Sequence, residues 1–484
     1  MGAGWRLEQS YAGLPALFHA RVAPTPVRDP QFVVFNGPLA EALGLDAASF
    51  DGAAGAALFA GNALPEGAAP LAQAYAGHQF GFFTGLGDGR AILLGEQVTP
   101  DGRRVDIQLK GAGPTPYSRR GDGRAALGPM LRELVVSEAM HALGIPTSRS
   151  LAVVSTGEPV YRERPLPGAV LTRVASSHLR VGTFEWAAAH RDTEALTALA
   201  DYTLRRHYPE LTAHETPYLA LFEAIAERQA RLVARWQLVG FVHGVMNTDN
   251  MALSGETIDY GPCAFLDRYD PATVFSSIDR DGRYAFGNQP GIARWNLARL
   301  AEALLPILAD DEARAVALAQ DVLARFPTRF HEHWLTGMRG KLGLVTAEAG
   351  DAALADGLLS WMQQAKADYT NTFRMLARGA DAEALAGADP AFAAWHQDWQ
   401  ARLAREAHPR DDAEALMRRS SPAVIPRNHK VEDALEAATE RGDLGPLERL
   451  MTALASPYDH VSVPPEFASP APDSSVPYRT FCGT

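Results

Sequence analysis

Cysteine is scarce in this chain of 484 residues, which contains only two. Two thiols exclude a disulfide framework and a cysteine-rich zinc site. A basic excess is also missing, because the formal net charge is −12 at pH 7, and this argues against a dedicated nucleic-acid-binding protein. No run of about 18 apolar residues occurs, so the sequence predicts no membrane span.

The first residues lack the features of a targeting signal. They have no basic n-region and no apolar h-region, and Arg6 stands where the myristoylation pattern requires Ser or Thr. A cytoplasmic protein is therefore expected. No coiled-coil heptads occur, which leaves the oligomeric state open, with a monomer as the expectation. The hydrophobic content of 47% supports a sizeable core.

The stretch from residue 243 to residue 261 has the spacing of a metal site beside phosphate. Asn250 and Asp259 lie nine residues apart, and the Ser-Gly-Glu between them predicts a strand, a tight turn and a second strand. A β-hairpin of this kind would bring an amide oxygen and a carboxylate together. Hard oxygen ligands of these two types suit Mg²⁺.

The same stretch matches part of the protein-kinase signature, which reads H-R-D-x-x-x-x-N and then D-F-G. His243 and Asn250 take the His and Asn places, and residues 259–261 (Asp-Tyr-Gly) take the place of D-F-G. The catalytic Asp is missing, because Val245 stands at its position. Asp249 is the substitute candidate for the base, with a turn residue or helix N-cap as the alternative.

The region before this stretch predicts phosphate-binding strands. Gly87 and Gly89 alternate in a GLGDGR segment, where glycine lets the backbone approach a ligand; a glycine-rich hairpin turn is the alternative. Strands at 90–98 and 104–110 follow, joined by a Thr-Pro-Asp-Gly turn. Lys110 ends the second strand on its polar face, where kinases carry the lysine of V-A-I-K; a solvated lysine is the alternative.

A helix is predicted from about residue 125 to 143, after a polar, glycine-rich loop at 111–125. In kinases a glutamate on such a helix holds the strand lysine. Glu133 and Glu138 are both candidates to hold Lys110, and the spacing leaves the choice open. For either glutamate, a solvated helix face is the alternative.

The next pair of predicted strands, at about 148–155 and 168–174, leads to two arginines. Arg173 ends the second of these strands, and Arg180 comes seven residues later. Paired arginines could clamp a triphosphate through bidentate contacts, whereas surface positions are the alternative.

The order of elements predicts an α+β, protein-kinase-like bilobal fold. Residues 1–75, rich in Gly, Ala and Pro, predict an irregular N-terminal extension packed on the core, with a helix near residues 39–43. Residues 76–180 would form a small β-rich N-lobe, 181–455 a large helical C-lobe with the catalytic and metal motifs, and 456–484 an extended tail. Helices of the C-lobe are expected at 182–190, 193–206, 217–238, 291–308, 311–325, 331–345, 350–379, 390–407, 411–419 and 431–455.

Over most of its length, from residue 72 onward, the chain resembles the selenoprotein O family of kinase-like proteins. Members of that family bind ATP in a flipped orientation and transfer AMP to protein hydroxyls, and uridylyl transfer with Mn²⁺ is also associated with them. The stretches that carry the resemblance are GLGDGRAILLGE (85–96), DIQLKGAGPTPYSRRGDGRA (106–125), SEAMHALGIPT (137–147), HGVMNTDNM (243–251), DYGPCAFLD (259–267) and IPRNH (425–429).

This resemblance implies a role for each candidate residue. Asp249 would accept the proton of the incoming Ser, Thr or Tyr hydroxyl. Asn250 and Asp259 would bind Mg²⁺ or Mn²⁺. ATP would be the substrate, and proteins with acceptor hydroxyls, redox proteins among them, would be the partners. The phosphates and the nucleotide would be held by Lys110 with Glu133 behind it, by Arg173 and Arg180, and by Gly87, Gly89, Arg90, Asp122 and Gly123.

The two cysteines suggest a redox latch. Cys263 lies two residues past the Asp-Tyr-Gly motif, and Cys482 stands on the tail, where some members of the family carry selenocysteine. A disulfide between them would tether the tail across the active site, and intracellular disulfides are usually transient or regulatory. The alternative is one buried cysteine and one exposed, inert thiol.

Three functions are compatible with these motifs. The first, which we expect, is a metal-dependent protein nucleotidylyltransferase. The second is a conventional kinase that uses Asp249 as its base. The third is a non-catalytic pseudokinase scaffold that binds nucleotide, and Val245 at the usual base position favours it.

Overall fold

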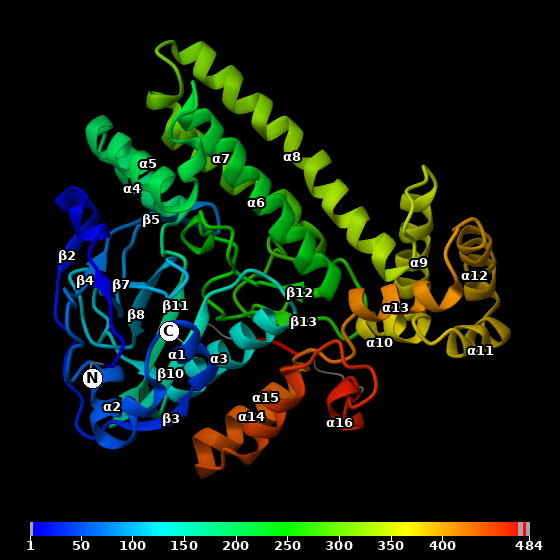
Figure 1. Cartoon of the computed structure of the whole chain (residues 1–484), viewed down its shortest axis with the longest axis horizontal. Helices are drawn as coiled ribbons and strands as arrows, with labels where there is room; N and C mark the ends of the chain where they lie inside the picture. The colour runs from blue at the N-terminus through cyan, green and yellow to red at the C-terminus, as the bar shows by residue number, and fades with distance from the viewer. Residues whose placement is uncertain (1–2, 473–477, 481–484) are drawn as a thin grey trace.

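The structure, a computed structural model, describes residues 3–472 and 478–480. It consists of a sheet-rich part and a helical part that extends away from it (Figure 1). The long helices α6 (Pro217–Val239) and α8 (Glu312–Lys341) run through the helical part. The predicted α+β, kinase-like class is confirmed. No helix within the described residues is long and apolar enough to cross a membrane.

One antiparallel sheet of nine strands organises the sheet-rich part. Its central strands include the two predicted at 90–98 and 104–110. In the second of these, Ile107 and Leu109 are fully buried in the core on one face, so Gln108 and Lys110 share the other face. The order is β2 (His19–Arg21), β4 (Leu71–Gln73), β7 (Ala91–Val98), β8 (Arg104–Lys110), β11 (Pro165–Ala175), β10 (Arg149–Tyr161) and β3 (Gln31–Phe35), with β1 (Leu7–Glu8) on β7 and β9 (Ala125–Ala126) on β11.

The segment up to residue 75 is not the irregular extension that its composition predicts. Its strands β2, β3 and β4 belong to the main sheet. Helix α1 (Gly37–Ala42) lies where a helix is expected, and α2 (Gly52–Phe59) packs on β3 through the rings of Phe59 and Phe35. Strands of three to five residues show too little periodicity to be recognised locally. They form because strands distant in the sequence complete their hydrogen bonds.

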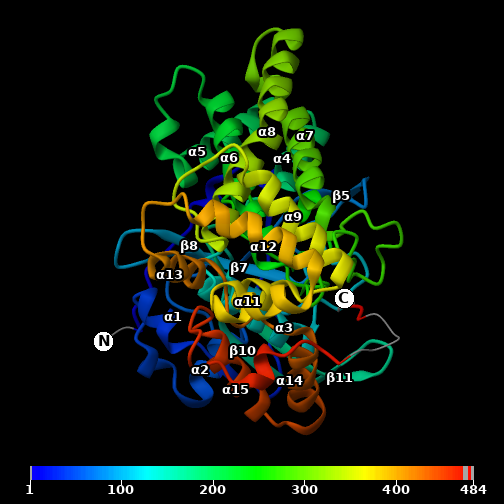
Figure 2. The same cartoon turned by 90° about the vertical axis from the view of Figure 1, so that its right-hand side faces the viewer.

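Helix α3 (Leu127–Ala142), predicted at 125–143, packs on β10 and β11. Two helices from the C-terminal region, α14 (Asn428–Arg441) and α15 (Gly445–Leu454), lie beside α3 (Figures 1 and 2). The three helices share one hydrophobic core. The sequence order alone assigns both helices to the helical C-lobe. That assignment is wrong, because the chain returns to the sheet-rich part and covers the outer side of α3.

Several helix boundaries in the helical part differ from those expected. α8 is continuous through Pro327, although two helices are expected there, because packing of α8 on α6 offsets the cost of an interior proline. The helix expected at 350–379 is interrupted at Lys366, which has a φ of 52°. The helices not yet named are α4 (Val181–Ala189), α5 (Thr193–His207), α7 (Gln289–Leu308), α9 (Asp351–Ala365), α10 (Tyr369–Leu376), α11 (Ala380–Ala388), α12 (Pro390–Leu403), α13 (Arg410–Ser420) and α16 (Pro465–Ala468).

The hairpin predicted between Asn250 and Asp259 is not formed. A turn is present, since Gly255 N donates to Ala252 O over 3.2 Å. Its two arms do not pair with each other, however: Ala252 bridges to Arg180, and Thr257 bridges to Thr147 of the sheet-rich part. The motif stretch is therefore bound to the segments around it, and these contacts fix Asp259 against the sheet. The expected extended tail also contains a helical turn, α16.

Lys341, at the end of α8, is a buried amine in the core of the helical part. It is 1% exposed, and its Nζ lies 4.0 Å from the centroid of the Phe373 ring. Burial lowers its pKa from the usual 10.5 to about 7. The unfolded chain therefore binds more protons than the folded one between these two values, so this group makes the free energy of unfolding rise with pH over that range.

We expect Lys341→Met to raise the melting temperature at pH 7 by about 3 °C, because the cost of burying an amine disappears. The advantage over the wild type should shrink as the pH approaches 10, where the unfolded amine is also neutral. Thermal melts of both proteins from pH 6 to 10 measure this. A variant that melts lower at pH 7 would show that the contact with the Phe373 ring outweighs burial.

Candidate functional site

A cleft of about 360 Å³ opens between the sheet-rich part and the helical part. It is lined by every residue that the sequence assigns to nucleotide binding, metal binding or base catalysis. Glu133 lies behind this wall, against Lys110. The lining residues of the predicted set are Gly87, Gly89, Arg90, Lys110, Asp122, Gly123, Arg173, Arg180, Asp249, Asn250 and Asp259.

The strand lysine is paired with one of its two candidate partners. Lys110 Nζ lies 2.5 Å from Glu133 Oε2. Glu138 is engaged elsewhere, because it accepts from both Arg149 Nε at 2.9 Å and Asn36 Nδ2 at 2.9 Å. The two glutamates lie five residues apart on α3, so only one of them faces the strand that ends at Lys110.

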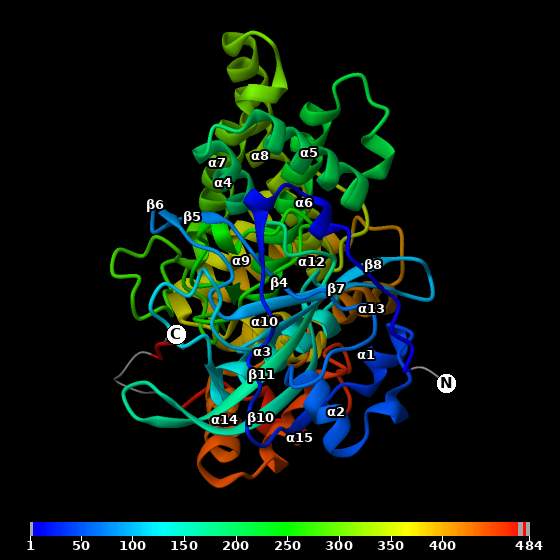
Figure 3. The same ribbon diagram turned by 90° about the vertical axis from the view of Figure 1, so that its left-hand side faces the viewer.

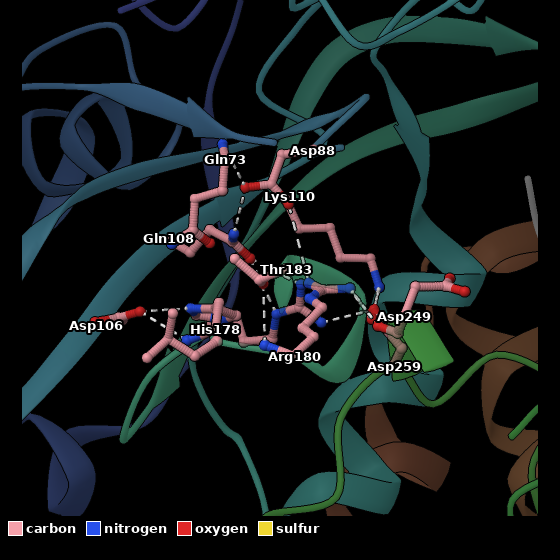
Figure 4. Close-up of polar contacts among 12 residues, drawn as sticks. Gln73, Asp88, Asp106, Gln108, Lys110, His178, Arg180, Thr183, Asp249 and Asp259 are labelled. Carbon is pink, nitrogen blue, oxygen red and sulfur yellow. Dashed lines mark hydrogen bonds and ion pairs between the residues drawn. The ribbon is translucent and has the colours of Figure 1, made fainter. Parts of the chain in front are cut away.

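Asp259 is the centre of a buried cluster of cations (Figure 4). Its Oδ1 lies 2.7 Å from Arg173 Nη1 and 3.0 Å from Lys110 Nζ, and its Oδ2 lies 3.1 Å from Arg180 Nη1. Burial alone would raise the pKa of this carboxyl, but Arg173, Lys110 and Arg180 together hold it well below its usual range. Asp259 also has a φ of +61°, an uncommon backbone conformation that the surrounding ion pairs support.

Two residues outside the predicted set support these cations. Gln108 Oε1 accepts from Arg173 Nη2 at 2.8 Å, and Gln108 Nε2 donates to Asp88 Oδ2 at 3.1 Å (Figure 4). The Oδ1 atom of Asp88 lies 3.9 Å from Arg180 Nη2. Burial raises the pKa of Asp88 to about 6, although Arg180 opposes this shift. Strand alternation could have identified Gln108, because it lies on the same face as Lys110.

Asp249 lies on a short 3₁₀ turn, Thr248–Asn250, and is buried. Its Oδ1 is a buried oxygen that makes no hydrogen bond within the described part of the chain. Burial raises the pKa of this carboxyl to about 7, although Arg180 opposes the shift. A buried oxygen without a partner is costly and points to a ligand at this position. Val245, at the usual place of the base, is a buried residue of the hydrophobic core.

The oxygen atoms around Asn250 fit a hard divalent cation. Asn250 Nδ2 donates to Val245 O at 3.0 Å, which leaves its Oδ1 available to a ligand. Asp259 contributes a carboxylate, and Asp249 the buried oxygen described above. Within the described residues no three His, Cys, Asp or Glu side chains converge on one point. Mg²⁺ usually takes one or two protein carboxylates together with substrate phosphates, so this donor set fits it and fits Mn²⁺.

The mouth of the cleft is formed by a polar loop. Asp122 is exposed and forms an ion pair with Arg162, with 2.9 Å between Oδ2 and Nη1. Gly123 and Gly87 have φ values of +67° and +124°, which favour glycine at both positions. Glycine therefore stands where the backbone must turn beside the cleft, both in this loop and in the segment before β7.

The proposed cysteine latch is described only at one end. Cys263 is buried, and Cys482 lies outside the described residues. The last described residue of the tail, Thr480, donates through Oγ1 to Pro262 O at 2.7 Å, next to Cys263 in the sequence. The disulfide remains a prediction.

A β-hairpin not assigned by the sequence supports the turn that carries Asp249. It consists of β5 (Ala76–Gln79) and β6 (Phe82–Gly85). His78 N donates to Thr248 Oγ1 at 2.7 Å, and Thr248 Oγ1 in turn donates to Glu185 Oε2 at 2.6 Å. The imidazole of His78 is bound to the same carboxylate, with 2.5 Å between Nδ1 and Oε1.

A kinase-like fold with a lysine–glutamate pair, a cationic cleft and clustered oxygen donors defines a nucleotide-dependent transferase. The chain belongs to the family described as protein adenylyltransferase SelO, whose sequence model matches residues 5–455. The family and the enzyme class expected from the sequence, a protein adenylyltransferase, are thereby confirmed.

Curated relatives match this chain over nearly its whole length. The protein nucleotidyltransferase YdiU of Bacillus cytotoxicus is 59% identical over 99% of this chain and 98% of its own length. The protein of the same name from Brevibacillus brevis is 60% identical over 99% of this chain and 98% of its own length. That of Bacillus mycoides is 58% identical over 99% of each chain.

Gly77 provides a steric test of how Asp249 is positioned. A Cβ at Gly77 would overlap Oδ1 of Asp249, whereas a Cβ at Gly85, on the partner strand, would meet only Trp186 Cζ3 at 3.4 Å. We expect Gly77→Ala to lower the rate of adenylyl transfer by about 10²-fold, because misplacing a reacting group by about 1 Å has that effect. Transfer of label from α-³²P-ATP measures the rate.

Gly85→Ala is the matched control, because it makes the same change in the same hairpin without reaching the carboxylate. It should retain most of the activity and melt at the same temperature as the wild type. Equal activities for the two variants would show that the position of Asp249 is not critical.

Proposed function

We propose that this enzyme transfers AMP from ATP to Ser, Thr or Tyr hydroxyls of protein substrates, with the nucleotide flipped relative to its orientation in protein kinases. The observation that supports a flipped nucleotide is the charge of the deep wall. The side chains of Arg173 and Arg180 are 2% and 3% exposed, and that of Lys110 is 10% exposed. A wall of three cations suits the β- and γ-phosphates better than a neutral adenine ring.

The same cations would stabilise the leaving group. Pyrophosphate departs with most of the negative charge, and prearranged guanidinium groups act strongly on such charge in a site that excludes water. Arg173 is fixed by Gln108 and Asp259, so it needs little reorganisation when charge develops. This placement supports the proposal that Arg173 and Arg180 hold the distal phosphates.

Asn250 and Asp259 are the residues that would hold Mg²⁺ or Mn²⁺. The metal would supply neutralisation of phosphate charge and alignment of the triphosphate with the acceptor. Asp259 is already ionised by its cationic neighbours, so it needs no proton release before it binds a divalent ion. Its contacts with Arg173 and Lys110 would then connect the metal ligand to the phosphate-binding side chains.

Asp249 would act as the general base. Its carboxylate would take the proton of the acceptor hydroxyl, the hydroxyl oxygen would attack the α-phosphorus, and the bond from that phosphorus to the bridging oxygen would break. The products are an AMP ester on the protein and pyrophosphate, and the proton stays on Asp249. Such a base contributes about 10² to 10⁴ in rate.

Incubation of the purified protein with a protein substrate and either α-³²P-ATP or γ-³²P-ATP, with Mg²⁺ or Mn²⁺, tests this proposal. We expect label from the α position only, reduced about 10² to 10⁴-fold in Asp249→Asn and abolished by EDTA. The same assay with α-³²P-UTP and Mn²⁺ measures transfer of UMP as a second nucleotide.

The alternative functions give different results in this assay. Label from the γ position only would identify a conventional kinase. Binding of ATP without label from either position would identify a pseudokinase scaffold. Either result, label from the γ position only or binding without label, would contradict AMP transfer.

The two glutamates of α3 provide a matched pair of variants. Glu133→Gln should raise the KM for ATP about tenfold, because Lys110 loses the carboxylate that orients it toward the phosphates. Glu138→Gln should leave the KM unchanged and lower the melting temperature, because it weakens contacts with Arg149, Asn36 and the backbone N–H of Ser150, all outside the cleft. Steady-state kinetics and thermal melts of both variants would separate these effects, and equal KM values would contradict the role of Glu133.

A further inference from the structure

The turn that carries Asp249 is held by a buried carboxylate from helix α4. Glu185 Oε2 accepts a hydrogen bond from Thr248 Oγ1 at 2.6 Å, and Thr248 directly precedes Asp249 in the chain. The side chain of Glu185 is 4% exposed. Asp249 lines the cleft, whereas Thr248 and Glu185 lie behind its wall. Glu185 therefore acts on the residue next to the carboxylate that faces the cleft.

The hydroxyl of Thr248 is fixed from two sides. It accepts from His78 N at 2.7 Å, a group that can only donate, and it donates to the Glu185 carboxylate, which accepts. His78 completes the arrangement, since its Nδ1 lies 2.5 Å from Glu185 Oε1. Each oxygen of the carboxylate thus has a partner, and the Thr248 side chain is held in one orientation.

Helix α4 also binds the turn through its N-terminal end. Arg180, which directly precedes the helix, donates through Nη1 to the carbonyl oxygen of Asp249 at 2.9 Å. Val181 N donates to Met251 O at 3.0 Å. Helix α4, strand β5 and the turn lie against one another, and Figure 3 shows β5 beside α4. The backbone from Asp249 onward is thus fixed by α4, and the contacts of Glu185 fix the residue before it.

The stability of the fold does not explain why a carboxylate is buried at this position. Burial raises the pKa of Glu185, and the hydrogen bond from Thr248 and the proximity of His78 oppose this shift. Replacing a buried ion pair by apolar residues of similar volume is often neutral or stabilising. The contribution of the Glu185–His78 pair is therefore sought in the position of the groups that it binds.

We propose that Glu185 is a positioning residue for the base: through the hydroxyl of Thr248 it fixes the carboxylate of Asp249. His78 orients the Glu185 carboxylate for this role. The inference rests on the proposed function, because it requires that Asp249 takes the proton of the acceptor hydroxyl. A displacement of about 1 Å in a reacting group lowers a rate by about 10²-fold, so the contacts of Thr248 act on the rate of transfer.

Thr248→Val tests this link, because valine has the shape of threonine and makes neither hydrogen bond. We expect kcat for transfer from α-³²P-ATP to a protein substrate to fall about 10²-fold. The Kd for ATP should stay within about twofold of the wild type, because Lys110 and Arg173 are placed by strands β8 and β11. Thr248→Ser retains the hydroxyl and should keep kcat within about threefold of the wild type.

Glu185→Leu and the double variant Glu185→Leu/Thr248→Val test whether the two residues act as one unit. Glu185→Leu should lower kcat at least about tenfold, and the double variant should lose no more than Thr248→Val alone, because coupled effects are not additive. Thr203→Val is the matched control. Thr203 is a buried threonine of α5, and its hydroxyl donates to Leu199 O of the same helix at 2.8 Å. This control should keep the wild-type kcat.

Amide hydrogen exchange in residues 246–253, followed by mass spectrometry, measures the hold on the turn without a transfer reaction. Exchange there should be at least about tenfold faster in Thr248→Val than in the wild type, because local opening of the turn becomes easier. Thr248→Ser and Thr203→Val should exchange as the wild type does in this segment.

The outcomes separate this inference from the proposed function. A wild-type kcat in Thr248→Val, an equal loss in Thr248→Ser, or a multiplied loss in the double variant overturns the role of Glu185. A higher Kd for ATP in place of the lower kcat also overturns it, because the turn would then serve nucleotide binding. If the wild type transfers no label from the α position, the proposed function fails, and the exchange rates still decide whether the Thr248 hydroxyl holds the turn.

Discussion

The ion pairs of Asp259 are the interaction on which the arrangement of this molecule depends. One carboxylate from the helical side meets Lys110 of β8, Arg173 of β11 and Arg180, which precedes α4. Removing one partner from a buried cluster leaves the remaining charges uncompensated, which is strongly destabilising. The two parts of the chain are therefore held together in the wall of the cleft, and the geometry of the candidate site is coupled to the geometry of the fold.

The same constraint explains why the sheet-rich part is so heavily supported. Glu133 must stay within reach of Lys110, so α3 has to be fixed against the sheet. Helices α14 and α15 provide this by covering the outer side of α3 with a shared apolar core, although they come from the far end of the chain. The N-terminal strands support the sheet at its edges, where β3 pairs with β10 and β2 pairs with β4. Both ends of the chain thus stabilise one lysine–glutamate pair.

On the opposite side of the cleft, the structure fixes a carboxylate that lies outside the usual kinase position. Val245 belongs to the core, so the usual position offers no base. Asp249 is held by a different set of contacts, from the backbone of Gly77 and from Arg180, which donates to its carbonyl oxygen at 2.9 Å. The hairpin that supplies Gly77 (Figure 3) also binds the turn that carries Asp249, because His78 N donates to Thr248 Oγ1 at 2.7 Å. The position of the carboxylate consequently depends on one small element, the β5–β6 hairpin.

The sequence by itself determined the elements whose signals are local. Strand alternation predicted β8 and the face of the strand on which Lys110 lies, and helical periodicity predicted α3. Each of these patterns depends only on neighbouring residues. The tertiary structure alone decided the choices between distant partners: Glu133 rather than Glu138 for the lysine, α8 continuous through Pro327, and the arms of the 250–259 segment paired outward. These depend on packing and pairing energies between segments far apart in the chain, which no local pattern contains.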